Sequence, residues 1–307
     1  MKYELKIEHA DDKNGSIDLQ RLTTIADSLR KISEGALQLR LKGLSKAKKT
    51  INLNDALKVS LTGILEGSTV LCLESEKFEK TLPGYQTDFF MLEHQQELPQ
   101  KTPVTLFVES FEEALTNPDE SDLLDKPLLK ELLKFQKSFL KDDEVFSIQN
   151  EGSFKSLRLK KSDFRKIQIA EEEIPKPEST IINGIIEELT YSKLKVKIQT
   201  KGGIVEGFLS ESVNPEEIKN WWGKEATIAG TLHYKSGKRT VFEIERIFES
   251  QPGDEFFSKQ QRHENLEEQI QRQLQEGKQN NPLSMIVGAW PGKETDEEFE
   301  AMLNDLD

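Results

Sequence analysis

The residues best suited to catalysis are few and widely separated in this sequence. The four histidines and the single cysteine share no short metal-binding spacing; they are His9, Cys72, His94, His233 and His263. Cys72 falls in a predicted strand, where a buried and inert thiol is the default. Carboxylates are so abundant that no pair stands out as an acid and base couple. We therefore expect a protein that is not an enzyme, with no catalytic residue, no metal site and no cofactor.

The segment 281–307 carries the most distinctive pattern in the chain. A short apolar run leads into the turn Gly288-Ala-Trp-Pro-Gly292. With Lys293 this turn resembles a phosphate-binding P-loop, G-x-x-x-x-G-K-[ST]. It fails that pattern because the spacing is one residue short and Glu294 stands where the hydroxyl is required. The turn instead displays Trp290 on a bend beside a proline.

An acidic helix is predicted to follow this turn. Thr295 is placed to cap it, and Glu298 completes a capping box. One face is apolar and the opposite face is almost all carboxylate; the apolar residues are Phe299, Met302, Leu303 and Leu306. The preceding residues 257–279 are rich in Gln, Glu, Lys and Arg. We expect a flexible helical tail that acts as a ligand for another protein, and the alternative is a terminal helix docked on its own domain.

This tail resembles the neutralising arms of antitoxins that are paired with PIN-domain ribonuclease toxins. The resemblance covers the small apolar cluster, the G-x-W-P-G turn and the acidic D-E-E-F-x-x-x-L helix. It implies a partner with a carboxylate-lined, metal-dependent active site and a basic RNA groove. Lys293 would approach the partner's acidic site, or the acidic helix would imitate RNA along the groove. The implied partner-binding residues are Leu283, Ile286, Trp290, Pro291, Lys293, Phe299, Met302 and Leu303.

Composition limits the remaining function classes. The 307 residues carry a formal charge of −13, which argues against nucleic-acid or anionic-membrane binding by the chain as a whole. Hydrophobic residues make up 35%, enough for folded cores. The sequence shows neither a signal peptide, nor a disulfide framework, nor a run of about 20 apolar residues that would span a membrane. We expect a soluble cytoplasmic protein.

A small β-barrel is predicted over residues 181–250. Its five expected strands are 181–189, 194–200, 204–209, 226–234 and 240–247. Asn214 and Pro215 begin a short helix between the third and fourth strands. This order resembles an OB-fold, a five-stranded barrel that often binds oligonucleotides, and an SH3-like barrel is the close alternative. We expect the pair Trp221 and Trp222 to plug one barrel end.

The barrel is therefore an alternative functional site, for single-stranded nucleic acid. Such sites combine a basic groove with aromatic rings on which bases stack. The candidate residues are Tyr191, Lys195, Tyr234, Lys238 and Arg239, with Phe242 as a further aromatic candidate. The opposing interpretation is that the alternating lysines of residues 193–197 form an ordinary solvated strand face.

Overall we predict an α+β protein with an N-terminal α/β region, an OB-like barrel and a flexible tail. Residues 1–80 form a β-α-β-β unit. Residues 81–174 form a mainly helical region with two short strands, and this region packs on residues 1–80. In that region, helices are expected from Val104 to Leu115 and from Leu128 to Leu140. The remaining divisions are a linker at 175–180, the barrel at 181–250, a polar helix or linker at 251–280 and the interaction arm at 281–307.

Overall fold

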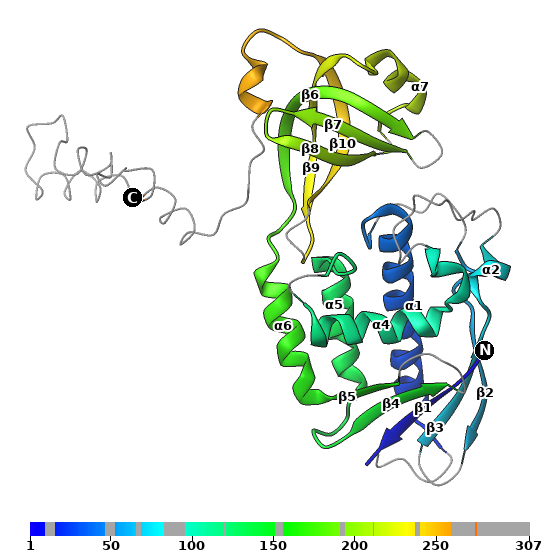
Figure 1. Cartoon of the computed structure of the whole chain (residues 1–307). Helices are drawn as coiled ribbons and strands as arrows, with labels where there is room; N and C mark the ends of the chain where they lie inside the picture. Colours follow the sequence, from blue (N-terminus) through cyan, green and yellow to red (C-terminus); the bar gives the residue numbers. More distant parts are fainter. Residues whose placement is uncertain are drawn as a thin grey trace, which may run out of the picture. The chain divides into compact units, whose positions relative to one another are not determined.

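The fold was obtained as a computed structural model. It describes residues 1–9, 16–46, 53–65, 69–82, 96–118, 121–150, 156–190, 194–210, 212–236, 240–258 and 274. The chain divides into two compact units, Met1–Gln260 and Gln261–Asp307. The first unit contains helices, an open sheet and a closed barrel, so the α+β class is confirmed (Figure 1). Within the described residues, none of the helices has the length and apolar character needed to cross a bilayer.

An antiparallel sheet of five strands forms the base of the N-terminal region, in the order β2-β3-β1-β4-β5. Its strands are β1 (Lys2–Glu8), β2 (Val59–Leu65), β3 (Thr69–Ser75), β4 (Val145–Asn150) and β5 (Leu157–Lys160). The central strand β1 alternates as predicted: Tyr3, Leu5 and Ile7 are buried, while the residues between them face solvent more openly. One face of the sheet therefore packs on the core and the other is polar.

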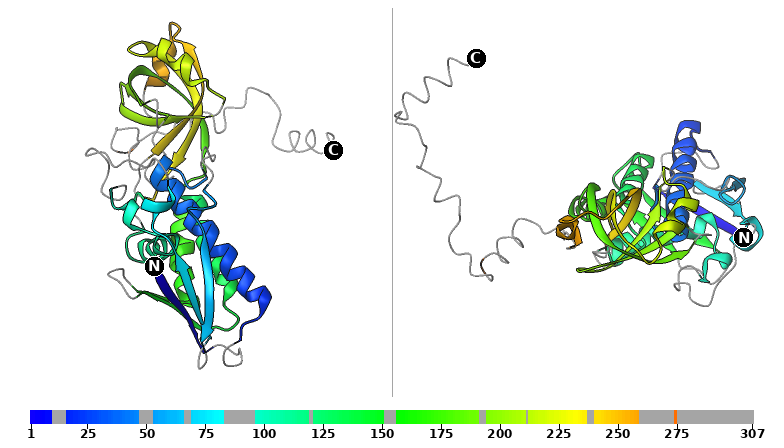
Figure 2. Two further views of the ribbon diagram at one scale, coloured as in Figure 1. Left: turned by 90° about the vertical axis from the view of Figure 1, so that its right-hand side faces the viewer. Right: turned by 90° about the horizontal axis from the view of Figure 1, so that it is seen from above.

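Four helices cover the buried face of this sheet, as Figure 1 shows. They are α1 (Leu19–Lys42), α4 (Pro103–Thr116), α5 (Lys126–Phe135) and α6 (Phe164–Glu173); the shorter elements are α2 (Phe78–Thr81), η1 (Leu98–Gln100), η2 (Gln136–Ser138) and η3 (Lys161–Asp163). The view turned by 90° in Figure 2 shows the long helix α1 running beside the sheet. This arrangement confirms the β-α-β-β order at the start of the chain.

Side-chain caps fix the ends of these helices. Asp18 accepts a hydrogen bond from the backbone N–H of Arg21, and Gly43 ends α1 in the left-handed conformation with φ of 84°. Asp125 caps α5 and also accepts two bonds from Ser45, at 2.8 Å from its backbone nitrogen and 2.6 Å from its hydroxyl. Buried Asp125 thus ties the start of α5 to the loop that follows α1.

The core between helices and sheet is rich in phenylalanine. Neighbouring rings are 4.5 to 6.2 Å apart between centroids, mostly edge to face, which is a favoured aromatic geometry. The rings belong to Phe107, Phe111, Phe135, Phe139, Phe146 and Phe164. The prediction that the second helix continues to Leu140 was wrong. It ends at Phe135, and a 3-10 turn then brings Phe139 into the core while Leu140 stays exposed.

The barrel closes in the order β10-β8-β7-β6-β9. Its strands are β6 (Glu178–Thr190), β7 (Lys195–Thr200), β8 (Gly203–Leu209), β9 (Glu225–Tyr234) and β10 (Thr240–Glu249). The strands β8 and β10 pair in parallel and all other pairs are antiparallel. A short helix α7 (Pro215–Ile218), capped by Asn214, lies between β8 and β9 as predicted, followed by the turn η5 (Lys219–Trp221). This connectivity fits the predicted OB-like barrel.

The first strand of the barrel begins earlier than expected, at Glu178 within the predicted linker 175–180. The chain enters it from α6, whose last turn is held by Lys126. The ammonium of Lys126 donates to the carbonyl oxygens of Glu171 and Ile174, both at 2.6 Å. After β10, the turn η6 (Asp254–Ser258) packs on β6, and Asp254 accepts a bond from Thr227 of the neighbouring strand β9 at 2.6 Å.

Candidate functional site

The outer face of β7 and β8 is the surface with which an OB-like barrel would meet a strand of nucleic acid. Strand alternation places Val196, Ile198 and Thr200 inside the barrel and leaves the residues between them outside. Three cross-strand pairs make up the outer face, namely Lys195 with Phe208, Lys197 with Glu206 and Gln199 with Ile204. The face is thus a mixture of cationic, anionic and apolar side chains.

Carboxylates neutralise Lys197, one of the two lysines on this face. The Lys197 ammonium lies 2.6 Å from a carboxylate oxygen of Glu188 on β6. Its hydrogen bond to Glu188 raises the pKa of Lys197, and the same bond lowers the pKa of Glu188. Glu206 is a further anion acting on Lys197. Since phosphate binding depends on uncompensated cations, this pairing disfavours a polyanion site here.

The predicted nucleic-acid residues do not assemble into one site in the part of the chain that the structure describes. Lys195 lies on the outer face of β7, but Tyr234 lies at the end of β9, which pairs with β6 and β10. The Tyr234 ring is buried and its hydroxyl donates to Glu178, so it is not available for stacking. Phe242 is fully buried inside the barrel. The other three candidates, Tyr191, Lys238 and Arg239, lie outside the described residues.

Trp222 is an exposed aromatic residue whose position sequence reasoning assigned wrongly. Its side chain was expected to plug the barrel end, but the residue is 67% exposed. The indole N–H donates to the backbone oxygen of Glu187 at 3.1 Å, which fixes the ring outside β6. Ile218 from α7 is fully buried in its place, and Trp221 is partly buried against the core. The positive φ of 70° at Gly223 marks the turn that carries Trp222 outward.

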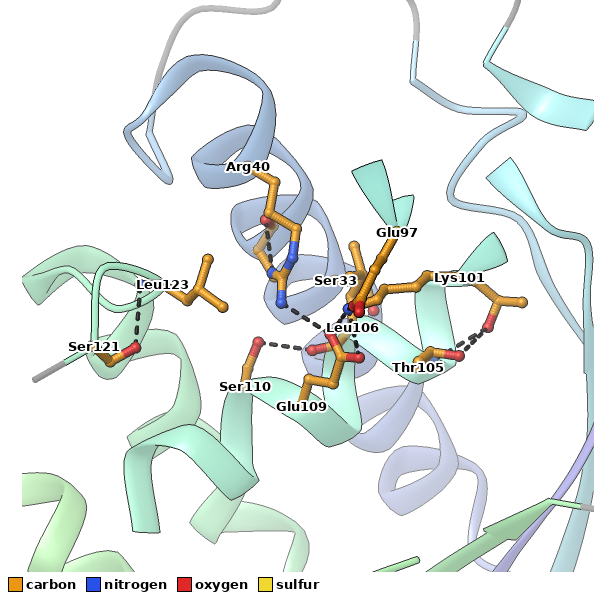
Figure 3. Close-up of polar contacts among 12 residues, drawn as sticks. Ser33, Arg40, Glu97, Lys101, Thr105, Leu106, Glu109, Ser110, Ser121 and Leu123 are labelled. Carbon is orange, nitrogen blue, oxygen red and sulfur yellow. Dashed lines mark hydrogen bonds and ion pairs between the residues drawn. The ribbon is translucent and has the colours of Figure 1, made fainter. Parts of the chain in front are cut away.

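A second polar cluster lies in the N-terminal region, where α1, η1 and α4 meet (Figure 3). Arg40 is almost fully buried and its guanidinium lies 2.9 Å from the carboxylate of Glu109. Burial lowers the pKa of Arg40, and the carboxylate of Glu109 opposes that shift. The Lys101 ammonium bridges Glu109 at 2.8 Å and Glu97 at 2.9 Å. Both carboxylates are thus engaged by cations, so the cluster suits holding helices together rather than proton transfer.

The described residues contain no group of three or more His, Cys, Asp or Glu side chains that could hold a metal ion. The partner-binding candidates of the tail all lie outside the described residues; they are Leu283, Ile286, Trp290, Pro291, Lys293, Phe299, Met302 and Leu303. They belong to the second unit, Gln261–Asp307.

Comparison with protein-family models, with curated proteins and with solved structures gives no significant match to this chain.

Proposed function

We propose that this protein binds and neutralises a PIN-type nuclease through its C-terminal arm, residues 281–307. One observation carries the proposal: the sequence of the tail joins the segment Gly-Ala-Trp-Pro-Gly to an acidic stretch with apolar residues at helical spacing, and it falls in the unit Gln261–Asp307. An aromatic anchor flanked by carboxylates suits a partner that has an apolar pocket beside a basic RNA groove. The barrel and the N-terminal region belong to the other unit, Met1–Gln260.

Trp290 is the residue on which the proposal is most sharply tested. The full chain is mixed with a purified PIN-type nuclease, and the Kd and the inhibition of RNA cleavage are measured. Truncating an aromatic hot spot costs about 2 to 4 kcal/mol, so Trp290→Ala should weaken binding by roughly 30-fold to 1000-fold. Trp222→Ala is the matched control, since it removes an exposed tryptophan from the barrel.

The controls separate an arm from a structural residue. Trp290→Ala should leave the thermal midpoint of the free protein nearly unchanged, because a side chain that becomes buried only in the complex contributes little to the core of the free protein. Single changes at Glu294, Asp296 and Glu297 should act mainly on the association rate and its salt dependence. A large fall of the midpoint in Trp290→Ala with unaltered nuclease binding would show that Trp290 belongs to the protein's own core. Equal losses in Trp290→Ala and Trp222→Ala would also refute the arm.

Binding of single-stranded nucleic acid by the barrel is the second candidate, supported by the OB-like connectivity alone. A salt titration with short single-stranded DNA and RNA tests it. Because Lys197 is paired with Glu188, we expect affinities weaker than about 1 µM. Tighter binding that falls steeply with salt and is lost in Lys195→Gln would favour this second function instead.

A further inference from the structure

The two edges of the N-terminal sheet differ in how they are protected against pairing with another strand. Edge strands expose unpaired backbone N–H and C=O groups, and natural sheets usually blunt them with short length or charge. The edge strand β5 has only four residues and carries the exposed cations Arg158 and Lys160. The opposite edge strand β2 has seven residues and no charged side chain. In the left view of Figure 2 the edge of the sheet that carries β2 faces the reader.

The side chains of β2 are more exposed than those of a protected apolar strand. Leu61 is 42% and Leu65 is 48% exposed. A register shift lies between Leu61 and Gly63, which makes Thr62 the extra residue of a β-bulge against β3. Large exposed leucines on an uncharged edge are typical of a strand that is covered in the working protein.

The bulge sets which side chains of β2 share a face. Those that pair with the core-facing residues of β3 lie on the helix-covered side; they are Val59, Leu61 and Ile64. Those that pair with the other β3 residues lie on the open side; they are Ser60, Gly63 and Leu65. The helix-covered side of the edge therefore presents an uninterrupted apolar row.

We propose that β2 pairs antiparallel with β2 of a second copy of this chain, forming a continuous ten-stranded sheet. A two-fold axis perpendicular to the sheet keeps both helix layers on the same side. With Leu61 on the axis and Thr62 left out of the pairing as the extra residue, Leu61 faces the partner subunit's Leu61, and Val59 faces the partner subunit's Ile64. The apolar row thus matches its own reverse.

Charge at the strand ends favours the same antiparallel alignment. Lys58 precedes β2 and Glu66 follows it in the sequence, so the reversed strands bring ends of opposite charge near each other. The charged edge β5 disfavours addition of a third copy. The assembly is therefore a closed dimer with an isologous interface rather than an open fibre.

Sedimentation velocity of the full chain over a concentration series is the first test. We expect a monomer–dimer equilibrium, and Leu61→Lys, which sets two ammonium groups together on the axis, should raise the dimer Kd by at least about tenfold. Leu140→Lys is the matched control, because Leu140 is 60% exposed and lies outside the sheet. A chain that remains monomeric throughout, or a dimer equally stable in both variants, would overturn the proposal.

Disulfide cross-linking tests the register independently of any loss of folding. In a Cys72→Ser background, Leu61→Cys should form a covalent dimer, since directly opposed residues have the Cα separation that a disulfide needs, about 4.5 to 5.5 Å. Leu65→Cys should not cross-link efficiently, because its own copy lies at the far end of the paired strands. Equal cross-linking of both variants, or capture of a strand from another protein by β2, would refute self-pairing. Trp290→Ala should leave the dimer unchanged, so the proposed arm and this interface fail separately.

Discussion

The buried ion pair between Arg21 and Glu144 should be the most sensitive electrostatic point of the N-terminal region. The guanidinium lies 2.8 Å from the carboxylate, and the two side chains are 2% and 0% exposed. Arg21 also donates to the Ser138 carbonyl oxygen at 3.2 Å, and Glu144 accepts the backbone N–H of Leu140 at 2.8 Å. Glu144→Ala therefore leaves a buried cation and a partly buried N–H without this acceptor.

Removing one partner of such a pair costs about 3 to 5 kcal/mol, a large part of the roughly 5 to 15 kcal/mol that stabilises a typical domain. With a urea m-value of about 2 kcal/mol/M, a loss of about 4 kcal/mol lowers the unfolding midpoint by about 2 M. The assay is urea denaturation followed by helical circular dichroism. Tryptophan fluorescence does not report on this region, because the three tryptophans are residues 221, 222 and 290.

A matched exposed pair provides the control. Lys161 and Asp142 lie 2.6 Å apart, but Asp142 is 90% exposed, so Asp142→Ala should cost less than about 1 kcal/mol. The double change Arg21→Met with Glu144→Leu should recover much of the loss, since it removes both charges and fills the space with apolar atoms. If Glu144→Ala shifts the midpoint no further than Asp142→Ala, the pair does not stabilise the fold as described.

Two further predictions concern the barrel. Gly230→Ala should prevent the barrel from closing, because a Cβ there would lie 2.0 Å from the Glu243 carbonyl oxygen. A thermal midpoint of the barrel equal to that of the unaltered protein would contradict this. Burial raises the pKa of Tyr234, so the unfolded phenol ionises before the folded one. The contribution of Tyr234 to the unfolding free energy is complete below about pH 10 and is lost as the pH rises further. The unfolding free energy measured against pH should therefore fall above about pH 10 in the unaltered protein, and this fall should be absent in Tyr234→Phe.

The sequence predicts well those features that local patterns determine. Alternation located all five barrel strands, and Asn214 beside a proline located the short helix between β8 and β9. Gly43 marked the end of α1 because a left-handed residue there favours glycine. These signals lie within a few residues of the feature they specify, so no tertiary information is needed to find them.

Features that depend on distant contacts were missed. Apolar spacing continues through Phe139, but the helix stops at Phe135, and a 3-10 turn brings Phe139 to 4.5 Å from Phe146 between ring centroids. The exposure of Trp222 depends on such a contact as well, because its indole N–H donates to the backbone oxygen of Glu187, 35 residues earlier in the chain. The neutralisation of Lys197 by Glu188 is likewise invisible in sequence, since it depends on the pairing of β6 with β7.

The central position of β1 has a consequence for the order in which the protein folds. This strand is synthesised before both of its neighbours, β3 and β4, and its second partner begins only at Val145. The N-terminal sheet therefore has a high contact order, and β1 must remain unpaired on one side until well over a hundred further residues exist. The barrel strands, in contrast, are contiguous from Glu178 to Glu249. During synthesis the sheet region is the slower and more aggregation-exposed part, and it is where a chaperone would act first.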